Sequence, residues 1–363
     1  MAGMSLTDTG AKELLEAHPR LAAFTFPNSH AGQTVLLPSS GRQFGYCEYV
    51  DTSVPSEQLR NVVLLPGIPG SRLFTHPDVR KHGCVKTWRL IVLERPGIGL
   101  SDPAPEQYAY ADFVADFREF CQQLGLRRVA VMGFSAGTPF ATAIACVQPQ
   151  QQTQAAASSA AKAPDAAKAG ADGDAAAGGK GSVEVEVAGV ALISAIGPPD
   201  TPNKRRGMAL MFQFAYWACT YAPWMVSWVV RHEATAFRRR PVHAIRQALS
   251  LYDCPADVEA LKRPEVEELF LESAMEIYSR AQEGAVHREN VNFAGRPWGF
   301  DLKTCRTPVT IWQGGKDKGC TVNMATHLEA SMGPGVKATI FPDEGHMVYF
   351  NVWDQVVGWI NGL

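Results

Sequence analysis

The first half of the chain alternates between short apolar runs and segments in which apolar residues recur at helical spacing. The runs at 61–67 and 88–97 each end at proline or glycine, and 128–135 is a third apolar run. Short apolar runs bounded in this way are typical of buried parallel strands. The segments that follow, 110–125 and 136–148, have helical spacing. Repeated alternation of strand and helix predicts a mainly parallel sheet with helices on both faces.

The alternation resumes near the end of the chain. The last apolar segment, VWDQVVGWING at 352–362, is amphipathic and predicts a closing helix, and VNMATHLEASM predicts another at 322–332. Further strands are predicted at 41–50, 187–197, 308–315 and 337–345.

Two segments interrupt this pattern. Residues 150–181 are dominated by Ala, Gly, Lys, Asp and Gln and hold no large apolar residue, which predicts a disordered insertion. Residues 198–296 look helical and are rich in aromatic residues and arginine, so we expect a helical cap over the strand ends, where ligands bind in such sheets. The core is then predicted to comprise 1–149 and 297–363, together with a strand within 183–197.

Residues 208–230 of the predicted cap are unusually apolar and aromatic. The stretch is long enough to span a bilayer in principle, but it contains Gln213, Thr220, Pro223 and Ser227. We therefore favour a buried or cavity-lining helix pair and keep contact with a membrane as the alternative.

Charge and cysteine content exclude several classes of function. The net charge is −2, so no basic excess points to nucleic acid. The eight cysteines stand far apart without a CxxC pair, which gives no support to a zinc cluster or a redox dithiol. The polar start of the chain lacks the pattern of a secretory signal, so we expect reduced thiols and a cytoplasmic location.

The clearest chemical motif is Gly133-Phe134-Ser135-Ala136-Gly137, which lies between an apolar strand and a helical segment. A G-x-S-x-G turn in that setting holds its serine hydroxyl above the sheet, at the start of a helix. Ser135 is therefore the predicted nucleophile.

A serine hydroxyl needs a neighbouring base, and that base needs an acid to orient it. His346 follows the last predicted strand and a glycine, which makes it the predicted base. Asp317 follows the strand at 308–315 and is the predicted acid, because the order Ser, Asp, His is the one this architecture uses. Asp200, after the preceding strand, stays open as an alternative acid, whereas Asp343 and Glu344 lie too close to His346 in sequence.

An oxyanion formed at the substrate carbonyl needs two hydrogen-bond donors. One is the backbone N–H of Ala136, the residue after the nucleophile, and the other is expected from the glycine turn at 64–73. Ile68, after Gly67, is our candidate. This chemistry needs no metal and no organic cofactor.

The ordered set of LLPGIPGS, LERPGIGLSDP, GFSAG, WQGGKD and DEGH resembles the α/β-hydrolase superfamily, in the branch of serine hydrolases with a helical cap. The resemblance covers residues 40–149, 183–200 and 297–363. The chain departs from the family's usual residues in three places: Glu94 stands for Asp, Pro66 for the His before the oxyanion glycine, and Thr321 for a proline after the acid.

The resemblance implies hydrolysis of an ester-like small molecule, a carboxylic ester or a thioester, through an acyl group on Ser135. The aromatic run of the cap suggests an apolar acyl or aromatic substrate, although packing within the cap explains it as well. Alternatives are an acyltransferase, a hydrolase of C–C bonds, or a non-catalytic binding protein, the last kept open by Pro66. A haloalkane dehalogenase or epoxide hydrolase is disfavoured, because its mechanism needs a carboxylate at position 135.

Overall fold

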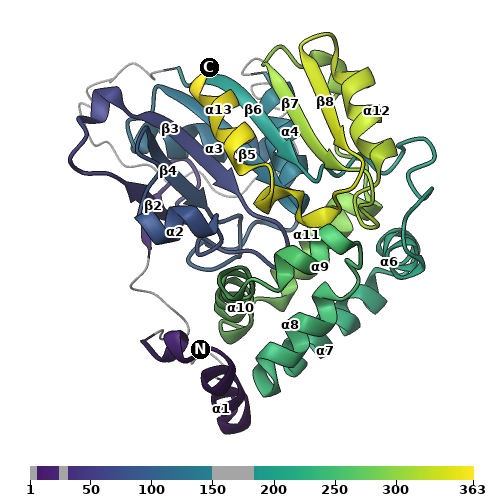
Figure 1. The fold of residues 1–363 in the computed structure, drawn as a ribbon. Coiled ribbons are helices and arrows are strands. Elements are labelled where there is room, and N and C mark those ends of the chain that lie inside the picture. Colours follow the sequence, from purple (N-terminus) through teal and green to yellow (C-terminus); the bar gives the residue numbers. More distant parts are fainter. Residues whose placement is uncertain (1–5, 24–31, 149–183) are drawn as a thin grey trace, which may run out of the picture.

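An eight-stranded sheet forms the centre of the molecule (Figure 1). The structure is a computed structural model that describes residues 6–23, 32–148 and 184–363, so the predicted disordered insertion at 150–181 lies outside the described residues. The strand order is β1-β2-β4-β3-β5-β6-β7-β8. The strands are β1 (Gln33–Leu36), β2 (Gln43–Val50), β3 (Arg60–Leu65), β4 (Trp88–Leu93), β5 (Arg128–Phe134), β6 (Glu186–Ile193), β7 (Val309–Gly314) and β8 (Val336–Phe341).

Strand direction agrees with the predicted mainly parallel sheet. From β4 to β8 every neighbouring pair is parallel, whereas β2 pairs with β4 and β1 pairs with β2 in the antiparallel sense. Strand β1 is not predicted from the sequence; it is four residues long and mostly exposed at the edge of the sheet. Its strand conformation depends on pairing with β2, which a local apolar pattern does not report.

Helices cover both faces of the sheet, as predicted. One face packs against α3 (Tyr110–Gln123), α4 (Thr138–Cys146) and α12 (Val322–Met332), and the other against α2 (Pro77–His82) and α13 (Trp353–Asn361). Figure 1 shows α13 in front of the sheet with α3 and α4 behind it. The central strands β3 and β5 are buried almost throughout, which explains their continuous apolar runs. The predicted α/β-hydrolase fold is confirmed.

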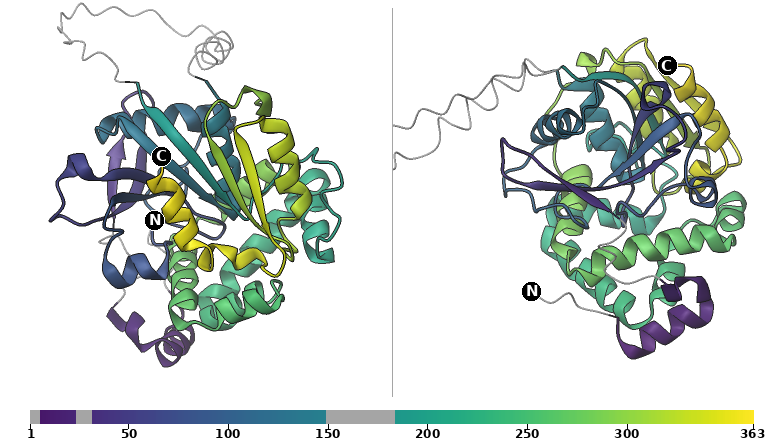
Figure 2. Two further views of the ribbon diagram at one scale, coloured as in Figure 1. Left: turned by 45° about the horizontal axis from the view of Figure 1, so that its top comes forward. Right: turned by 90° about the vertical axis from the view of Figure 1, so that its left-hand side faces the viewer.

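Six helices follow β6 and precede β7, and they lie beyond the carboxyl ends of the parallel strands (Figures 1 and 2). We call residues 210–295 the helical block; the assignment of 198–296 to a separate cap domain stays a prediction. The helices are α6 (Leu210–Tyr221), α7 (Pro223–Arg239), α8 (Pro241–Leu249), α9 (Pro255–Leu261), α10 (Pro264–Ser279) and α11 (Glu283–Gly295).

The N-terminal helix α1 (Asp8–Ala17) packs against the helical block and not against the sheet (Figure 2). The Thr7 N–H donates to the carbonyl of Arg238 over 3.0 Å, and His18 Nε2 lies 2.8 Å from Glu267. Among the described helices, none combines the length and apolar character that crossing a bilayer requires.

Candidate active site

The turn after β5 holds Ser135 in a backbone conformation that only close packing maintains. Its φ is +50°, a strained value for a residue with a side chain, and the turn leads through the short 3-10 helix Ser135–Gly137 into α4. A Cβ at Gly137 would lie 2.0 Å from the carbonyl oxygen of Leu65, and one at Gly133 would lie 2.9 Å from Ala141. Both glycines of the motif are therefore needed for β3 and α4 to approach the turn.

The structure brings Ser135, His346 and Asp317 together in a row. His346 Nε2 lies 3.1 Å from Ser135 Oγ, and His346 Nδ1 lies 2.8 Å from Asp317 Oδ2. A carboxylate only accepts hydrogen bonds, so the contact with Asp317 places a proton on Nδ1. Nε2 is then free to accept the proton of the serine hydroxyl.

Asp317 is held in place by the loop that follows β7. Its Oδ1 accepts hydrogen bonds from the N–H groups of Gly319 and Cys320, at 2.8 and 2.9 Å. Asp200, the alternative acid, is exposed and lines a surface pocket with Trp298 and His327. Of the two carboxylates weighed from the sequence, the one in contact with the imidazole is Asp317.

The surroundings of His346 act on its pKa in opposite directions. Burial of the imidazole lowers the pKa, while the charge and hydrogen bond of Asp317, together with the charge of Asp257, raise it. The pKa lies above its ordinary value of 6.5, because the carboxylates outweigh the desolvation. The imidazolium that forms when the base accepts a proton is thus stabilised in advance.

Two residues of the helical block support His346, and neither is predicted from the sequence. Asp257 of α9 accepts hydrogen bonds from the N–H groups of His346 and Met347, at 2.9 and 2.8 Å. The ring of Tyr252 stacks on the imidazole with centroids 4.3 Å apart and planes 10° apart. An Asp two residues after the proline that begins a helix is ordinarily read as a helix-start residue, so no local signal points to its contact with His346.

The predicted oxyanion residues flank the nucleophile. Ala136 is buried within the first turn after Ser135, where N–H groups lack intrahelical partners. A Cβ on Gly67, the residue before Ile68, would lie 3.1 Å from Ser135 Cβ. The Ile68 N–H donates to no group in the described part of the chain, so it is available to a ligand.

Arg95 fixes the orientation of this loop. Its guanidinium donates to the carbonyls of Pro66 and Gly67, the latter over 2.9 Å, and forms a bidentate pair with Glu289 of α11 at 2.7 and 2.9 Å. In a trans peptide the C=O of Gly67 and the N–H of Ile68 point in opposite directions. The Ile68 N–H therefore points away from Arg95. Because Pro66 stands where the family usually has a histidine, Arg95 is the side chain that holds this peptide in its orientation.

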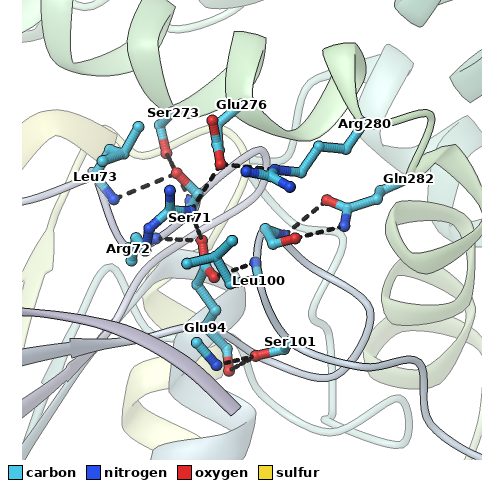
Figure 3. Close-up of polar contacts among 12 residues, drawn as sticks. Ser71, Arg72, Leu73, Glu94, Leu100, Ser101, Ser273, Glu276, Arg280 and Gln282 are labelled. Atoms are coloured by element: carbon cyan, nitrogen blue, oxygen red, sulfur yellow. Dashed lines mark hydrogen bonds and ion pairs between the residues drawn. The ribbon is translucent and has the colours of Figure 1, made fainter. Parts of the chain in front are cut away.

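A second group of buried charges joins the loops after β3 and β4 to α10 (Figure 3). Arg72 donates to Glu94 over 2.9 Å and to Glu276 over 2.8 Å, and Arg280 reaches Glu276 over 2.7 Å. Glu94 also accepts from the N–H of Leu100 over 2.6 Å. We call Arg72, Glu94, Glu276 and Arg280 the buried ion network. Burial raises the pKa of the Glu94 carboxyl, although Arg72 opposes this rise.

A cavity of about 290 Å³ reaches Ser135 and His346. Its wall is mainly apolar and is built largely by the helical block, from side chains that include Phe212, Val226, Val230, Ile245, Leu249 and Phe270. Gly67 and Ile68 line the same cavity. A reacting carbonyl in this space would meet the serine hydroxyl and the loop donors together.

One carboxylate interrupts the apolar wall. Glu233 lies on α7 one turn after Val229 and Val230, so it shares their cavity-lining face. The residue is exposed at the mouth of the cavity and has no hydrogen bond or ion pair with the described residues, while the apolar groups around it raise the pKa of its carboxyl by desolvation. Its carboxyl is therefore a polar feature that a ligand in the cavity would meet.

The site also holds three groups whose donor atoms lie within 4.8 Å of one another: Asp317, Cys320 and His346. They are a poor match for a metal ion. Burial and the charge of Asp317 raise the pKa of the Cys320 thiol well above its ordinary value, which keeps it protonated. Asp317 and His346 already bind each other, so a metal would have to displace their hydrogen bond.

The fold of this chain is similar to that of several known proteins. Residues 60–174 match the family model for the alpha/beta hydrolase fold. An esterase from Rhodococcus sp. is similar in structure, with a TM-score of 0.56, 17% identity, and coverage of 92% of this chain and 99% of the other. An esterase from Thermogutta terrifontis has a TM-score of 0.54 and 19% identity, covering 91% and 97%.

A third similar structure is that of a lactonase. The enol-lactonase from Burkholderia xenovorans has a TM-score of 0.52 and 14% identity, covering 91% of this chain and all of the other, at 100%. None of the curated proteins matches the sequence. At these identities the similarity establishes the shared fold and not the activity.

Proposed function

We propose that this chain, which matches the family model of the alpha/beta hydrolase fold over residues 60–174, is a serine hydrolase that cleaves an ester-like small molecule. The observation that carries the proposal is the row of Ser135, His346 and Asp317, joined by contacts of 3.1 and 2.8 Å. The named activities of the similar structures, esterase and enol-lactonase, are consistent with this reaction class.

In the proposed mechanism Ser135 Oγ attacks the substrate carbonyl while His346 Nε2 takes the hydroxyl proton. Asp317 stabilises the imidazolium that results. The imidazolium then gives its proton to the leaving alkoxide or thiolate, and an acyl group remains on Ser135. A water molecule, deprotonated by His346, attacks that acyl group, and the proton returns to Ser135 as the acid product leaves.

The Ile68 and Ala136 N–H groups are the proposed donors to the negatively charged oxygen of both tetrahedral intermediates. Arg95 positions the Ile68 N–H by fixing the peptide between Gly67 and Ile68. Such donors act most strongly where water is excluded, as in the largely apolar cavity around Ser135.

The substrate that we propose has an apolar acyl or aromatic portion. The cavity wall is predominantly aliphatic and aromatic. The cavity, at about 290 Å³, is small enough to select a compact molecule. A carboxylic ester or thioester with a medium-length chain would fill it.

Turnover of p-nitrophenyl esters of increasing acyl length tests the proposal. We expect wild-type protein to release p-nitrophenol and His346→Ala to lose nearly all of that rate while keeping its fold. Product analysis in the presence of added alcohols separates hydrolysis from acyl transfer. Tight binding of the esters without turnover would instead identify a binding protein and contradict the proposal.

A further inference from the structure

The outer surface of α6 and α7 is strongly apolar. Eight of the eleven exposed large hydrophobic side chains in the described residues lie between 210 and 229, and Trp224 and Trp228 are 72% and 67% exposed. We call the following six residues the aromatic face: Leu210, Phe214, Trp217, Tyr221, Trp224 and Trp228.

The members of the aromatic face form a row on each of the two helices. On α6 its members recur at helical spacing along one side, and Trp217 lies 5.7 Å from Phe214 and 6.1 Å from Tyr221 between ring centroids. On α7, Trp224 and Trp228 are one turn apart. Both helices lie at the outer edge of the helical block, away from the sheet (Figure 1).

The inner sides of the same helices already have their packing partners. Tyr216 of α6 packs edge-on against Phe293 of α11, with centroids 6.3 Å apart. Val226 and Val230 of α7 line the cavity. A surface helix of a soluble protein usually keeps one polar side, so the apolar outer side of α6 requires an external contact to account for it.

The charge around the aromatic face favours a negatively charged partner. Residues 201–240 contain seven Lys or Arg and one acidic residue, Glu233, in a chain whose net charge is −2. Arg205, Arg206 and Arg231 are exposed and form no ion pair with the described residues. Arg231 follows Trp228 by three positions on α7, so a cation borders the aromatic stripe directly.

The aromatic face with arginines beside it fits a lipid surface better than a second copy of the chain. A symmetric dimer through the aromatic face would bring the basic residues of both copies together, and like charges at an interface are unfavourable. Tryptophan and tyrosine with flanking arginine are the residues that settle at the boundary between lipid headgroups and acyl chains. Anionic headgroups would pair with the arginines while the rings enter the boundary.

We propose that the aromatic face docks on anionic lipid surfaces, with α6 and α7 lying flat on the membrane. Docking of this kind needs no helix long enough to cross a bilayer. Met211 and Val229 belong both to the exposed apolar surface and to the wall of the cavity that holds Ser135. A docked chain would therefore hold the cavity next to the lipid, where an apolar substrate is most concentrated.

Vesicle binding tests the docking surface without using the proposed activity. Full-length protein is mixed with phosphatidylcholine vesicles that contain phosphatidylglycerol and with vesicles of phosphatidylcholine alone, and the bound fraction is measured by flotation. We expect binding to the anionic vesicles, weakened by salt, and a shift of tryptophan emission to shorter wavelength. The variant Trp224→Ser/Trp228→Ser should bind at least about tenfold more weakly.

Three further variants make the result specific. Arg205→Glu/Arg231→Glu should lose the preference for anionic vesicles, and Leu36→Ser, which removes an exposed leucine from β1, should bind like wild type. Ser135→Ala should also bind like wild type, so failure of the proposed hydrolase activity and failure of docking are separate results. Equal binding of wild type and the double tryptophan variant would overturn the proposal. Absence of binding would also overturn it, above all if wild type dimerises and the tryptophan variant does not.

Discussion

The helical block meets its surroundings in two contrasting ways. Along α10 and α11 it meets the core through buried charges: Arg72 bridges Glu94 and Glu276, and Arg95 pairs with Glu289. Along α6 and α7 its outer side meets solvent through the aromatic face, in which Phe214, Trp217 and Tyr221 contact one another. The side that faces the core is buried and held by ion pairs, whereas the outer side is apolar and exposed to solvent.

The contrast separates two kinds of constraint on this chain. A buried charge that loses its partner keeps its desolvation penalty, so the side facing the core tolerates little change. An exposed ring has little contact to lose, so a substitution on the outer side should cost little in folding free energy. Substitutions on the two sides should therefore separate stability from association.

The largest difference should appear in stability. Arg72→Met leaves the carboxylates of Glu94 and Glu276 buried without their shared cation, and we expect a loss of about 3–5 kcal/mol in the free energy of unfolding. Trp228→Ser, the control from the outer side, should change it by less than about 0.5 kcal/mol. Denaturation in urea measures both. Similar losses in the two variants would remove the distinction.

The next effect concerns the loop at the proposed oxyanion site. Arg95→Lys replaces a planar fork that makes four hydrogen bonds with three donors on one nitrogen, so the Gly67–Ile68 peptide should lose its fixed orientation. We expect kcat to fall about tenfold or more with little change in KM, since the contact acts when the oxyanion forms. Arg89→Lys, which alters a bidentate pair with Glu48 away from the site, serves as the control. A change confined to KM would argue against this role.

A smaller effect is expected in the pH dependence. The pKa of His346 lies above 6.5, and the proposed base must be neutral, so kcat/KM should rise with pH through a midpoint above that value. Asp257→Asn removes a charge that raises this pKa, so the midpoint should move to lower pH. Asp253→Asn, in the exposed loop before α9, should leave the midpoint in place. A midpoint that moves to higher pH in Asp257→Asn would contradict the predicted direction.

The raised pKa of His346 also links protonation to folding. A histidine with a higher pKa in the folded state stabilises the protein fully below the pKa of the unfolded chain. That stabilisation is lost as pH rises through the folded value. The pH range in which the base becomes neutral is therefore the range in which this contribution to stability disappears.

The smallest predicted effect concerns the cavity wall. Glu233→Gln removes a charge that faces an apolar space, so KM for a medium-chain ester should fall about two- to fivefold while kcat stays similar. The difference from wild type should shrink as pH falls and protonates Glu233. Glu16→Gln on α1 is the exposed control. A rise in KM would indicate instead that the substrate carries a group that binds this carboxylate.

Local sequence pattern predicts most of the sheet and the three residues in the row, because each depends on neighbours in sequence. The apolar runs mark the strands, and the turns after β5, β7 and β8 mark Ser135, Asp317 and His346. No local sequence pattern identifies Asp257 or Glu289 as a residue of the site. Their partners are His346, 89 residues away in sequence, and Arg95, 194 residues away, so they become visible only when the helical block is folded onto the core.

The stretch 208–230 shows a similar limit. Its composition fits both a helix pair that lines a cavity and one that contacts a membrane, and in the structure the same helices have a cavity-lining side and an exposed apolar side. Inner residues such as Val226 and Val230 line the cavity, while Trp224 and Trp228 are exposed. Composition alone does not separate the sides, because both are apolar.

The most direct test of the central claim is labelling by a fluorophosphonate, which phosphonylates a serine, with loss of fluoride, only when a neighbouring base activates that serine. We expect wild-type protein to gain one adduct, located on Ser135 by mass spectrometry of its peptides. Ser135→Ala should gain none, and His346→Ala should react far more slowly. Equal labelling of wild type and Ser135→Ala would contradict the assignment of Ser135 as the nucleophile.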